Sequence, residues 1–364
     1  MLKDKSILFI INNLDLGGAG KMMKYVINKS SAWFKNVSLI EVYAKEASKE
    51  IPESVMTFPL GVEVKGVIGF RYMIVKSIRE IVKREKPDIV LTFVSDMCVN
   101  TRIATLGLNT IVCSADRGDP YTETFPWTIL VPWAFNSSDY CFFQLDKARD
   151  GYSHKVQKKS FVISNVFIPK PGNTPYNGER RKTIVSAGRF VIEKGYDVLI
   201  KVFAKVHEKH PEYTMTIYGE GPFIDQYHKL AQELGVDELI TYPGYVKDVA
   251  ASVREDGVFV LPSRYEGIPN SLIEALSVGI PCVATDCTPG GPMFLTKGGK
   301  NGLIVPIDDI EAMTEAILRI IEDPKLAKEL ETQGPEVINE LKDEVICKMW
   351  FDAFEKIFAD NDKH

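Results

Sequence analysis

The chain has 364 residues, more than one hydrophobic core usually spans, so two domains of about 150 to 180 residues are expected. Its 45% hydrophobic and 26% charged residues are typical of a soluble globular protein, and no apolar run reaches the ~20 residues of a membrane-spanning helix. The net charge of -5 is unevenly divided: residues 1–170 hold 23 Lys/Arg against 17 Asp/Glu, a net +6, whereas residues 171–364 hold 21 against 32, a net -11.

This composition predicts neither an exported protein nor a zinc protein. The first residues lack a cleavable signal pattern, so we expect a cytoplasmic location. The six cysteines include no CxxC pair, and several lie in apolar runs, which suits reduced, buried thiols. His207 and His210 are the only closely spaced histidines, and a place on a helix surface explains them better than a metal site does.

The first half of the chain alternates between apolar runs and helix patterns. Residues 6–12 form a continuous apolar run, as in a buried parallel strand, and a glycine-rich segment, 14–20, precedes the next helix pattern. Its glycines permit close backbone approach to a ligand, but the spacing is not GxGxxG, so a dinucleotide site is not supported. The alternation predicts a doubly wound α/β domain, with further strands at 37–43, 55–60, 88–94, 110–114, 139–143 and 160–164.

Two segments of this half leave alternatives open. Residues 69–86 predict an amphipathic helix with a cationic face, which either packs as an ordinary surface helix or contacts anionic lipid headgroups or a lipid diphosphate. Residues 121–143 carry Trp127 and Trp133, and aromatic residues at helical spacing serve either in a core or in a membrane interface.

A second α/β series follows residues 165–182, which are rich in Pro, Gly and Asn and form the best candidate for an interdomain linker. We therefore expect one domain at residues 1–170 and another at residues 171–345. Strands of the second domain are predicted near 183–187, 213–218, 239–242, 258–261, 281–285 and 303–305.

The loop after the first of these strands carries two cations. Gly188 permits a turn, and Arg189 and Lys194 lie five residues apart. Arginine offers a planar fork for phosphate oxygens and lysine a mobile point charge, so the pair suits a sugar-nucleotide diphosphate of charge about -2 without a metal ion. The ordinary alternative is a solvated loop.

A second loop and helix start, residues 263–275, follow another apolar run. Amides at a helix N-terminus lie at the positive end of the helix dipole, and three such amides could face an anion, those of Asn270, Ser271 and Leu272. Glu266 and Glu274 flank the same opening, and carboxylates suit hydroxyl groups, here of ribose and sugar. Alternatively, the two glutamates only interact with the helix dipole. Both loops follow parallel strands, whose carboxyl ends form ligand sites in such sheets.

These stretches resemble the retaining glycosyltransferases of family 4, which have the GT-B fold. Glu266 and Glu274 match the E-x7-E motif of that family, and the resemblance covers most of the C-terminal domain. In the N-terminal half it is carried by residues 14–20, 114–121 and 139–152. The motifs of the C-terminal domain that carry the resemblance are GRFVIEKG, YGEGP, SRYEGIPNSLIEALSVGIPCVATDCTPGGP and NGLIVP.

The resemblance implies two Rossmann-like, doubly wound domains that face a central cleft, and a C-terminal helix in residues 346–364 that crosses back to the N-terminal domain. Arg189 and Lys194 would hold the diphosphate and stabilise the leaving group. Glu274 would accept hydrogen bonds from ribose hydroxyls and Glu266 from donor-sugar hydroxyls.

The resemblance also implies roles for the N-terminal domain. Gly17 and Gly18 would let its first loop close over the donor, and the acceptor would contact Asp116, Arg117 and Asp119. Many family members carry a histidine in this acceptor-side loop, whereas this chain has none there, and Asp116 is the candidate replacement.

The implied activity is metal-independent transfer of a hexose or N-acetylhexosamine, with retention, from a UDP-sugar to a growing glycan in polysaccharide biosynthesis. No cofactor or nucleic acid is expected. The glycan acceptor is expected to be linked to a polyprenyl diphosphate, and contact with an anionic membrane would place the protein on the inner face of the cell membrane. The alternatives are a GT-B-like sugar-nucleotide epimerase and an inactive partner subunit.

Overall fold

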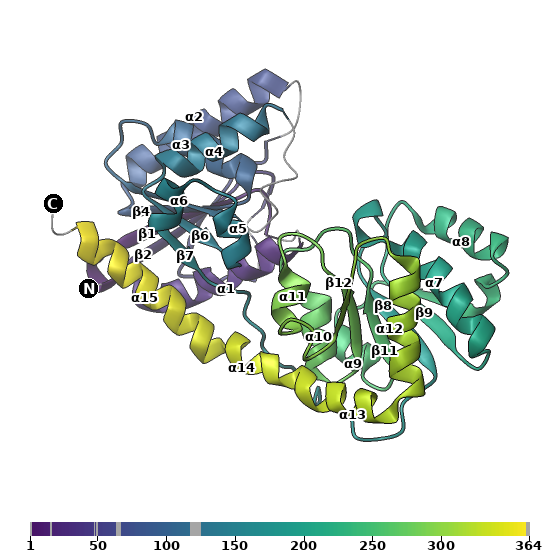
Figure 1. Cartoon of the computed structure of the whole chain (residues 1–364). Coiled ribbons are helices and arrows are strands. Elements are labelled where there is room, and N and C mark those ends of the chain that lie inside the picture. Colours follow the sequence, from purple (N-terminus) through teal and green to yellow (C-terminus); the bar gives the residue numbers. More distant parts are fainter. Residues whose placement is uncertain are drawn as a thin grey trace. The chain divides into compact units, whose positions relative to one another are not determined.

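A computed structural model describes residues 2–14, 17–46, 48, 50–62, 67–116 and 125–361, and it divides the chain into two compact units (Figure 1). The first unit comprises Met1–Val166 and Asp343–His364, and the second comprises Phe167–Lys342. Within the described ranges, no helix is both long and apolar enough to cross a membrane.

The first unit is built on a seven-stranded sheet in the order β3-β2-β1-β4-β5-β6-β7, in which every paired strand is parallel. The expected doubly wound architecture is thereby confirmed. The strands are β1 (Ser6–Ile11), β2 (Asn36–Glu41), β3 (Met56–Pro59), β4 (Ile89–Phe93), β5 (Ile111–Asp116), β6 (Tyr140–Phe143) and β7 (Ser160–Val162).

Helices cover both faces of this sheet because alternate strand residues point to opposite sides. One face packs on α1 (Gly17–Trp33) and α15 (Asp343–Asn361), with Trp350 fully buried. The other face packs on α2 (Val67–Glu85) and α3 (Ser95–Ala104). The remaining helices of this unit are α4 (Trp127–Ser137), α5 (Asp146–Asp150) and α6 (His154–Lys158).

The terminal helix α15 begins three residues before the predicted segment 346–364 and is described up to Asn361, and it belongs to the first unit. Its first turn is fixed to α1 by polar contacts: Lys29 forms an ion pair with the Asp343 carboxylate at 2.8 Å, and the Tyr25 hydroxyl donates to the Asp343 carbonyl oxygen at 3.2 Å. Trp33 and Phe351 then meet edge to face, so both polar and aromatic contacts hold the helix.

The second unit has a six-stranded parallel sheet in the order β10-β9-β8-β11-β12-β13. Its strands are β8 (Thr183–Ala187), β9 (Thr214–Tyr218), β10 (Ile240–Gly244), β11 (Val258–Leu261), β12 (Cys282–Thr285) and β13 (Leu303–Val305). One core combines these strands with α7 (Tyr196–Lys209), α8 (Ile224–Glu233), α12 (Ile310–Glu322) and α13 (Pro324–Gln333). The other elements are the 3-10 turns η2 (Ile192–Lys194), η3 (Asp237–Leu239) and η4 (Gly334–Val337), and the helices α9 (Val249–Val253), α10 (Asn270–Ser277), α11 (Gly291–Leu295) and α14 (Ile338–Leu341). A short 3-10 turn, η1 (Leu2–Asp4), precedes β1 in the first unit.

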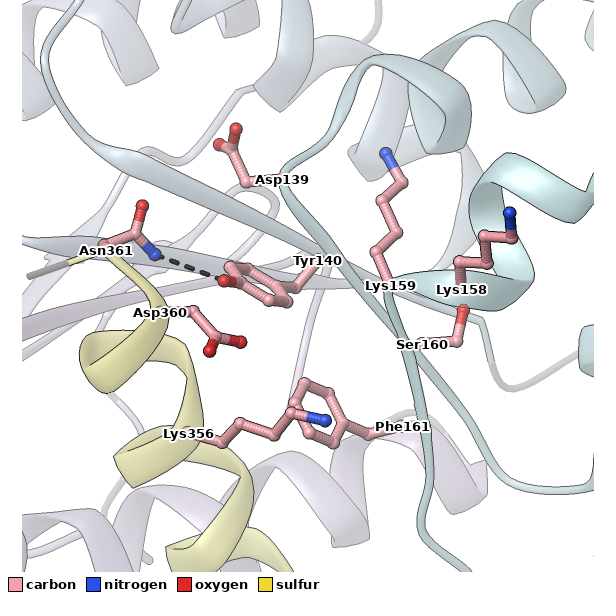
Figure 2. Close-up of a pocket in the computed structure, with 9 residues that line it drawn as sticks. All are labelled: Asp139, Tyr140, Lys158, Lys159, Ser160, Phe161, Lys356, Asp360 and Asn361. Atoms are coloured by element: carbon pink, nitrogen blue, oxygen red, sulfur yellow. Dashed lines mark hydrogen bonds between the residues drawn. The ribbon is translucent and has the colours of Figure 1, made fainter. Parts of the chain in front are cut away.

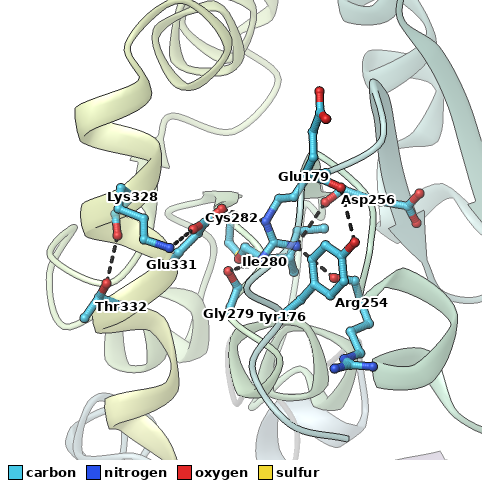
Figure 3. Close-up of polar contacts among 11 residues, drawn as sticks. Tyr176, Glu179, Arg254, Asp256, Gly279, Ile280, Cys282, Lys328, Glu331 and Thr332 are labelled. Atoms are coloured by element: carbon cyan, nitrogen blue, oxygen red, sulfur yellow. Dashed lines mark hydrogen bonds and ion pairs between the residues drawn. The ribbon is translucent and has the colours of Figure 1, made fainter.

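The predicted linker, 165–182, is largely a fixed part of the second unit. The Arg180 guanidinium donates to the Gly279 carbonyl at 2.6 Å and to the Arg254 carbonyl at 2.8 Å, and it forms an ion pair with Glu331 at 2.7 Å (Figure 3). The Tyr176 amide donates to the Val278 carbonyl at 3.1 Å. The segment connects the two units, as its Pro/Gly composition predicted, but the contacts of the largely buried Arg180 and of the Tyr176 amide fix it to the second unit.

Candidate functional site

The two predicted donor loops lie next to each other at one edge of the second sheet. β8 and β11 are neighbouring parallel strands, so the loops that follow them leave the same carboxyl edge. The first loop runs through Gly188 and Arg189 to η2, and the second runs from Pro262 to the start of α10. The Arg264 amide donates to the Glu193 carbonyl at 2.8 Å, which joins the loops directly.

Two glycines permit this close approach. Gly195 has φ +66°, and a Cβ there would lie 2.2 Å from the Pro262 carbonyl oxygen of the other loop. At Gly188, a Cβ would lie 2.8 Å from the Tyr196 hydroxyl, whose ring is buried beneath the loop. A larger residue at Gly195 would push the two loops apart, whereas a larger residue at Gly188 would clash with the Tyr196 hydroxyl, so Gly188 supports the site through packing.

Lys194 and Glu266 form an ion pair across the two loops. The Lys194 ammonium contacts Oε1 of Glu266, and the Ser263 hydroxyl donates to the same oxygen at 2.9 Å. Both charged side chains are largely buried, Glu266 more so than Lys194. From the sequence, Lys194 is expected to contact the diphosphate and Glu266 the hydroxyls of the donor sugar. The structure shows that the two side chains also form an ion pair with each other.

Arg189 lies on the same loop with an exposed side chain, so it contributes an accessible positive charge beside the buried pair. Its phosphate-binding role stays a prediction. The loop therefore carries one cation fixed by an ion pair and one exposed cation.

One of the three amides predicted to face an anion at the N-terminus of α10 is hydrogen-bonded. The Leu272 amide donates to the Pro269 carbonyl oxygen at 3.1 Å, in a tight first turn, so the prediction that this amide is unpaired is wrong. Asn270 and Ser271 are the first two residues of the helix, directly before Leu272. Their amides remain the candidates for contact with an anion.

Glu274 has a structural contact that the sequence analysis missed. Its Oε2 accepts hydrogen bonds from the Val249 amide at 2.9 Å and the Ala250 amide at 3.4 Å, so it caps α9. The dipole alternative placed this carboxylate at its own helix, whereas it caps a neighbouring one. Its predicted contact with ribose hydroxyls would have to coexist with this cap.

The acceptor-side predictions are placed only in part. Asp116 ends β5, is buried, and accepts a hydrogen bond from the Tyr152 hydroxyl at 2.8 Å. Gly17 and Gly18 are exposed in the first turn of α1, and Gly17 has φ +64° with open space on the side where a Cβ would lie. Arg117 and Asp119 lie outside the described residues.

Asn12 and Asp96 form a second polar group at the carboxyl edge of the first sheet. The Asn12 amide group donates to Oδ1 of Asp96 at 3.4 Å, and the Met97 amide donates to the same atom at 2.9 Å. Burial raises the pKa of the Asp96 carboxyl above its ordinary value, although these hydrogen bonds oppose the shift. The sequence could have indicated these two residues by their positions just after β1 and β4, because polar residues that follow parallel strands line the carboxyl edge of the sheet.

A pocket of about 350 Å³ opens at the opposite, amino-terminal side of β6 and β7 (Figure 2). It includes Tyr140, whose hydroxyl accepts a hydrogen bond from Asn361 of α15 at 3.3 Å, and Lys356, whose ammonium lies over the Phe161 ring. None of the predicted site residues lines it. In the part of the chain that the structure describes, no group of three or more His, Cys, Asp or Glu side chains could hold a metal ion.

Comparison with known proteins supports the resemblance. Residues 175–337 match the family described as glycosyl transferases group 1. An uncharacterised glycosyltransferase of Haemophilus influenzae is 24% identical over 355 residues, which are 95% of this chain and 99% of that protein. The predicted resemblance to glycosyltransferases of this type is confirmed.

Solved structures show the fold. The apo form of the lipopolysaccharide outer core galactosyltransferase WaaB gives a TM-score of 0.76 at 19% identity and covers 96% of this chain and 99% of its own. HepE of Anabaena, solved with UDP-glucose, gives a TM-score of 0.76 at 17% identity, and the match covers 98% of this chain and 100% of HepE. The predicted GT-B class, two Rossmann-like α/β domains, is therefore confirmed.

Proposed function

We propose that the chain is a retaining glycosyltransferase of polysaccharide biosynthesis, because residues 175–337 match the family described as glycosyl transferases group 1 and the chain has the GT-B fold. It would transfer a hexose or an N-acetylhexosamine from a UDP-sugar to a growing glycan. The observation that carries this proposal is the Lys194–Glu266 pair, which joins a cation and a hydroxyl acceptor at the edge where parallel sheets bind ligands.

The donor is proposed to be a UDP-sugar bound without a metal ion. Arg189 and Lys194 together carry two positive charges, which balance the approximate charge of a nucleotide diphosphate. The similar HepE structure holds UDP-glucose, which supports this choice of nucleotide. Glu274, one helix turn beyond Asn270 and Ser271, would accept from the ribose hydroxyls, while the two amides face the diphosphate.

Donor binding would divide the Lys194–Glu266 pair. The diphosphate would attract the Lys194 ammonium, and Glu266, still held by Ser263, would turn its carboxylate to a hydroxyl of the donor sugar. The exchange replaces one ion pair by a phosphate contact and a charged hydrogen bond, so neither buried charge is left without a partner.

Transfer would then proceed on one face of the sugar. The bond between the anomeric carbon and the β-phosphate oxygen breaks through an oxocarbenium-like state, and the acceptor oxygen bonds to the same face as its proton passes to the departing phosphate. Arg189 and Lys194 stabilise the charge that develops on the diphosphate. No enzyme nucleophile is required, and the configuration is retained.

The acceptor is proposed to be a glycan linked to a polyprenyl diphosphate, and it would contact the first unit near Asp116, Arg117 and Asp119. The WaaB structure, which is similar in fold, belongs to an enzyme of lipopolysaccharide assembly, and this supports a glycan acceptor. Because such an acceptor is anchored in a lipid bilayer, the first unit would work on the inner face of the cell membrane.

Exposed side chains on α2 and α4 suit that location. Phe125 and Ile129 are 80% and 62% exposed at the start of α4, a helix without any charged residue, and Tyr72 on α2 is 66% exposed. The Arg71 guanidinium lies 4.1 Å from the centre of the Trp127 ring, so the two helices meet there. We call the exposed aromatic, aliphatic and basic side chains of α2, of α4 and of the residue Phe125 before α4 the α2–α4 surface: Tyr72, Met73, Lys76, Lys83, Arg84, Phe125, Ile129 and Trp133. The exposed Glu80 of α2 lies among them, 3.9 Å from Lys76. Aromatic residues beside cations suit an anionic lipid interface.

A screen of UDP-sugars in the presence of EDTA tests the proposed function. The purified protein should release UDP from one of them and add the sugar to a glycan acceptor with retention. Loss of all turnover in EDTA would contradict metal independence, and a new sugar nucleotide formed without any acceptor would identify an epimerase instead. Nucleotide binding without turnover on any donor would indicate an inactive partner subunit.

A further inference from the structure

Arg264 holds together the two loops of the candidate donor site. Its guanidinium makes a two-pronged ion pair with Asp197, at 2.9 and 2.8 Å, and its Nε lies 2.8 Å from Oδ1 of Asp308. A further N–H donates to the Ile192 carbonyl oxygen at 2.7 Å. One side chain therefore joins η2, the first turn of α7 and the loop after β13.

The contacts of Arg264 lie close in sequence to both members of the Lys194–Glu266 ion pair. Ile192 begins the 3-10 turn that Lys194 ends, and Arg264 precedes Glu266 by two residues. The Arg264 amide also donates to the Glu193 carbonyl at 2.8 Å, so both the backbone and the side chain of Arg264 form hydrogen bonds with η2, the turn that contains Lys194. Any rotation of that turn would have to break several of these bonds at once.

The chemistry of the contacts requires arginine rather than just a positive charge. A planar guanidinium can serve two carboxylates and a carbonyl in fixed directions, which an ammonium group cannot do. Burial by itself would raise the pKa of Asp197, yet the hydrogen bonds and the positive charge of Arg264, together with a backbone hydrogen bond and the charge of Lys201, lower it. The Asp197 carboxylate is thus ionised and bound to Arg264 throughout the neutral range.

We infer that Arg264 is a positioning residue for sugar transfer: it fixes the turn so that the Lys194 ammonium reaches the leaving diphosphate while Glu266 stays in place for the donor sugar. The inference rests on the proposed function. It adds a residue that touches no substrate and acts through Lys194. A purely structural role would stabilise the domain without any special dependence on Lys194.

A double-mutant cycle on transfer kinetics separates the two roles. Arg264→Ala should lower kcat at least roughly tenfold in the wild-type background, because a displaced cation stabilises the leaving group less. In a Lys194→Ala background the same change should cost less than about threefold, since the residue it positions is already absent. Arg264→Lys keeps the positive charge but loses the planar guanidinium. It should lower kcat as Arg264→Ala does, with a smaller loss of melting temperature.

Arg181→Ala provides the matched control, because Arg181 is half-exposed and pairs with Asp256 at 3.3 Å just before β8, at the other end of that strand. It should leave kcat unchanged. Equal losses from Arg264→Lys or Arg264→Ala in both backgrounds would overturn the inference, as would full activity of either variant. A wild-type protein that transfers no sugar would instead refute the proposed function, so the two failures are distinct.

Discussion

The Lys194 ammonium contacts Oε1 of Glu266 across 72 residues of sequence, and both side chains are mostly withdrawn from solvent. Each group therefore depends on the other while no ligand is bound. The pair links the stability of the second unit to its proposed chemistry.

Removing one member of the pair should destabilise the protein. Lys194→Ala leaves Glu266 buried without its cation, which typically costs about 3 kcal/mol or more for a fully buried pair and should cost less here because Lys194 is partly exposed. The double variant Lys194→Met with Glu266→Gln should recover most of the lost melting temperature and still transfer no sugar. Urea unfolding and a transfer assay of both variants and the wild-type protein check this, and recovery of activity in the double variant would contradict the proposed roles.

Glu274 should show a combined effect on stability and donor binding. Glu274→Ala removes the acceptor for the Val249 amide and should cost about 1 kcal/mol of unfolding free energy, as loss of a helix cap does. Glu274→Gln keeps an oxygen for that amide, so its melting temperature should stay near wild type while binding of UDP weakens. Unchanged UDP affinity in both variants would restrict Glu274 to the α9 cap.

Asp256 should make the protein less stable as the pH rises. Burial raises the pKa of its carboxyl to about 6, partly opposed by Arg181. The folded state then holds a proton that the unfolded state loses near pH 4, so stability falls between about pH 4 and pH 6 and stays lower above that range. Asp256→Asn should remove this dependence and gain up to about 2 to 3 kcal/mol at neutral pH. Unfolding curves of the two proteins at pH 5 and pH 8 measure it, and parallel pH profiles would contradict the assignment.

Asp116 should affect the acceptor more than the donor. Asp116→Asn retains a hydrogen-bond acceptor for the Tyr152 hydroxyl but loses the charge, so KM for the acceptor should rise or kcat should fall with little change in KM for the UDP-sugar. Tyr152→Phe is the matched control, because it removes only the hydroxyl that holds this carboxylate. If Asp116→Asn left transfer kinetics unaltered, the carboxylate would serve packing alone.

The α2–α4 surface should bind anionic vesicles. Sedimentation with vesicles of phosphatidylglycerol and phosphatidylcholine should retain the wild-type protein at low salt, and Phe125→Ser with Ile129→Ser should weaken retention at least roughly tenfold through lost apolar burial. Lys76→Glu with Lys83→Glu should act in the same direction and remove most of the salt dependence. Lys325→Glu with Lys328→Glu, on exposed α13 of the second unit, is the matched control and should change nothing. Equal retention of all variants would exclude this surface.

The sequence predicted the fold well because it rests on local patterns. Continuous apolar runs such as 6–12 and 258–261 identify buried parallel strands, and the alternation with helices specifies the doubly wound arrangement. The predicted bounds of 258–261 and 303–305 agree with β11 and β13, and those of several other strands differ by one or two residues, as element ends commonly do.

The side-chain partners could not be predicted in the same way. Nothing local to Glu274 indicates that it caps α9, and nothing near Arg180 indicates that it anchors a Pro/Gly segment to Gly279 and Glu331. Both contacts join residues that only the folded sheet brings together. Arg264 lies within the motif SRYEGIPN, but its positioning role could not be predicted from that motif, because it depends on contacts with three segments that are distant in sequence.

Calorimetric binding of UDP in EDTA tests the central claim most directly, that the two loops after β8 and β11 form a metal-independent donor site. The wild-type protein should bind UDP, Lys194→Ala and Glu274→Gln should each weaken binding at least roughly tenfold, and Arg181→Ala should bind as the wild type does. UDP affinity that is the same in all four proteins, or that appears only with added divalent metal, would contradict the account.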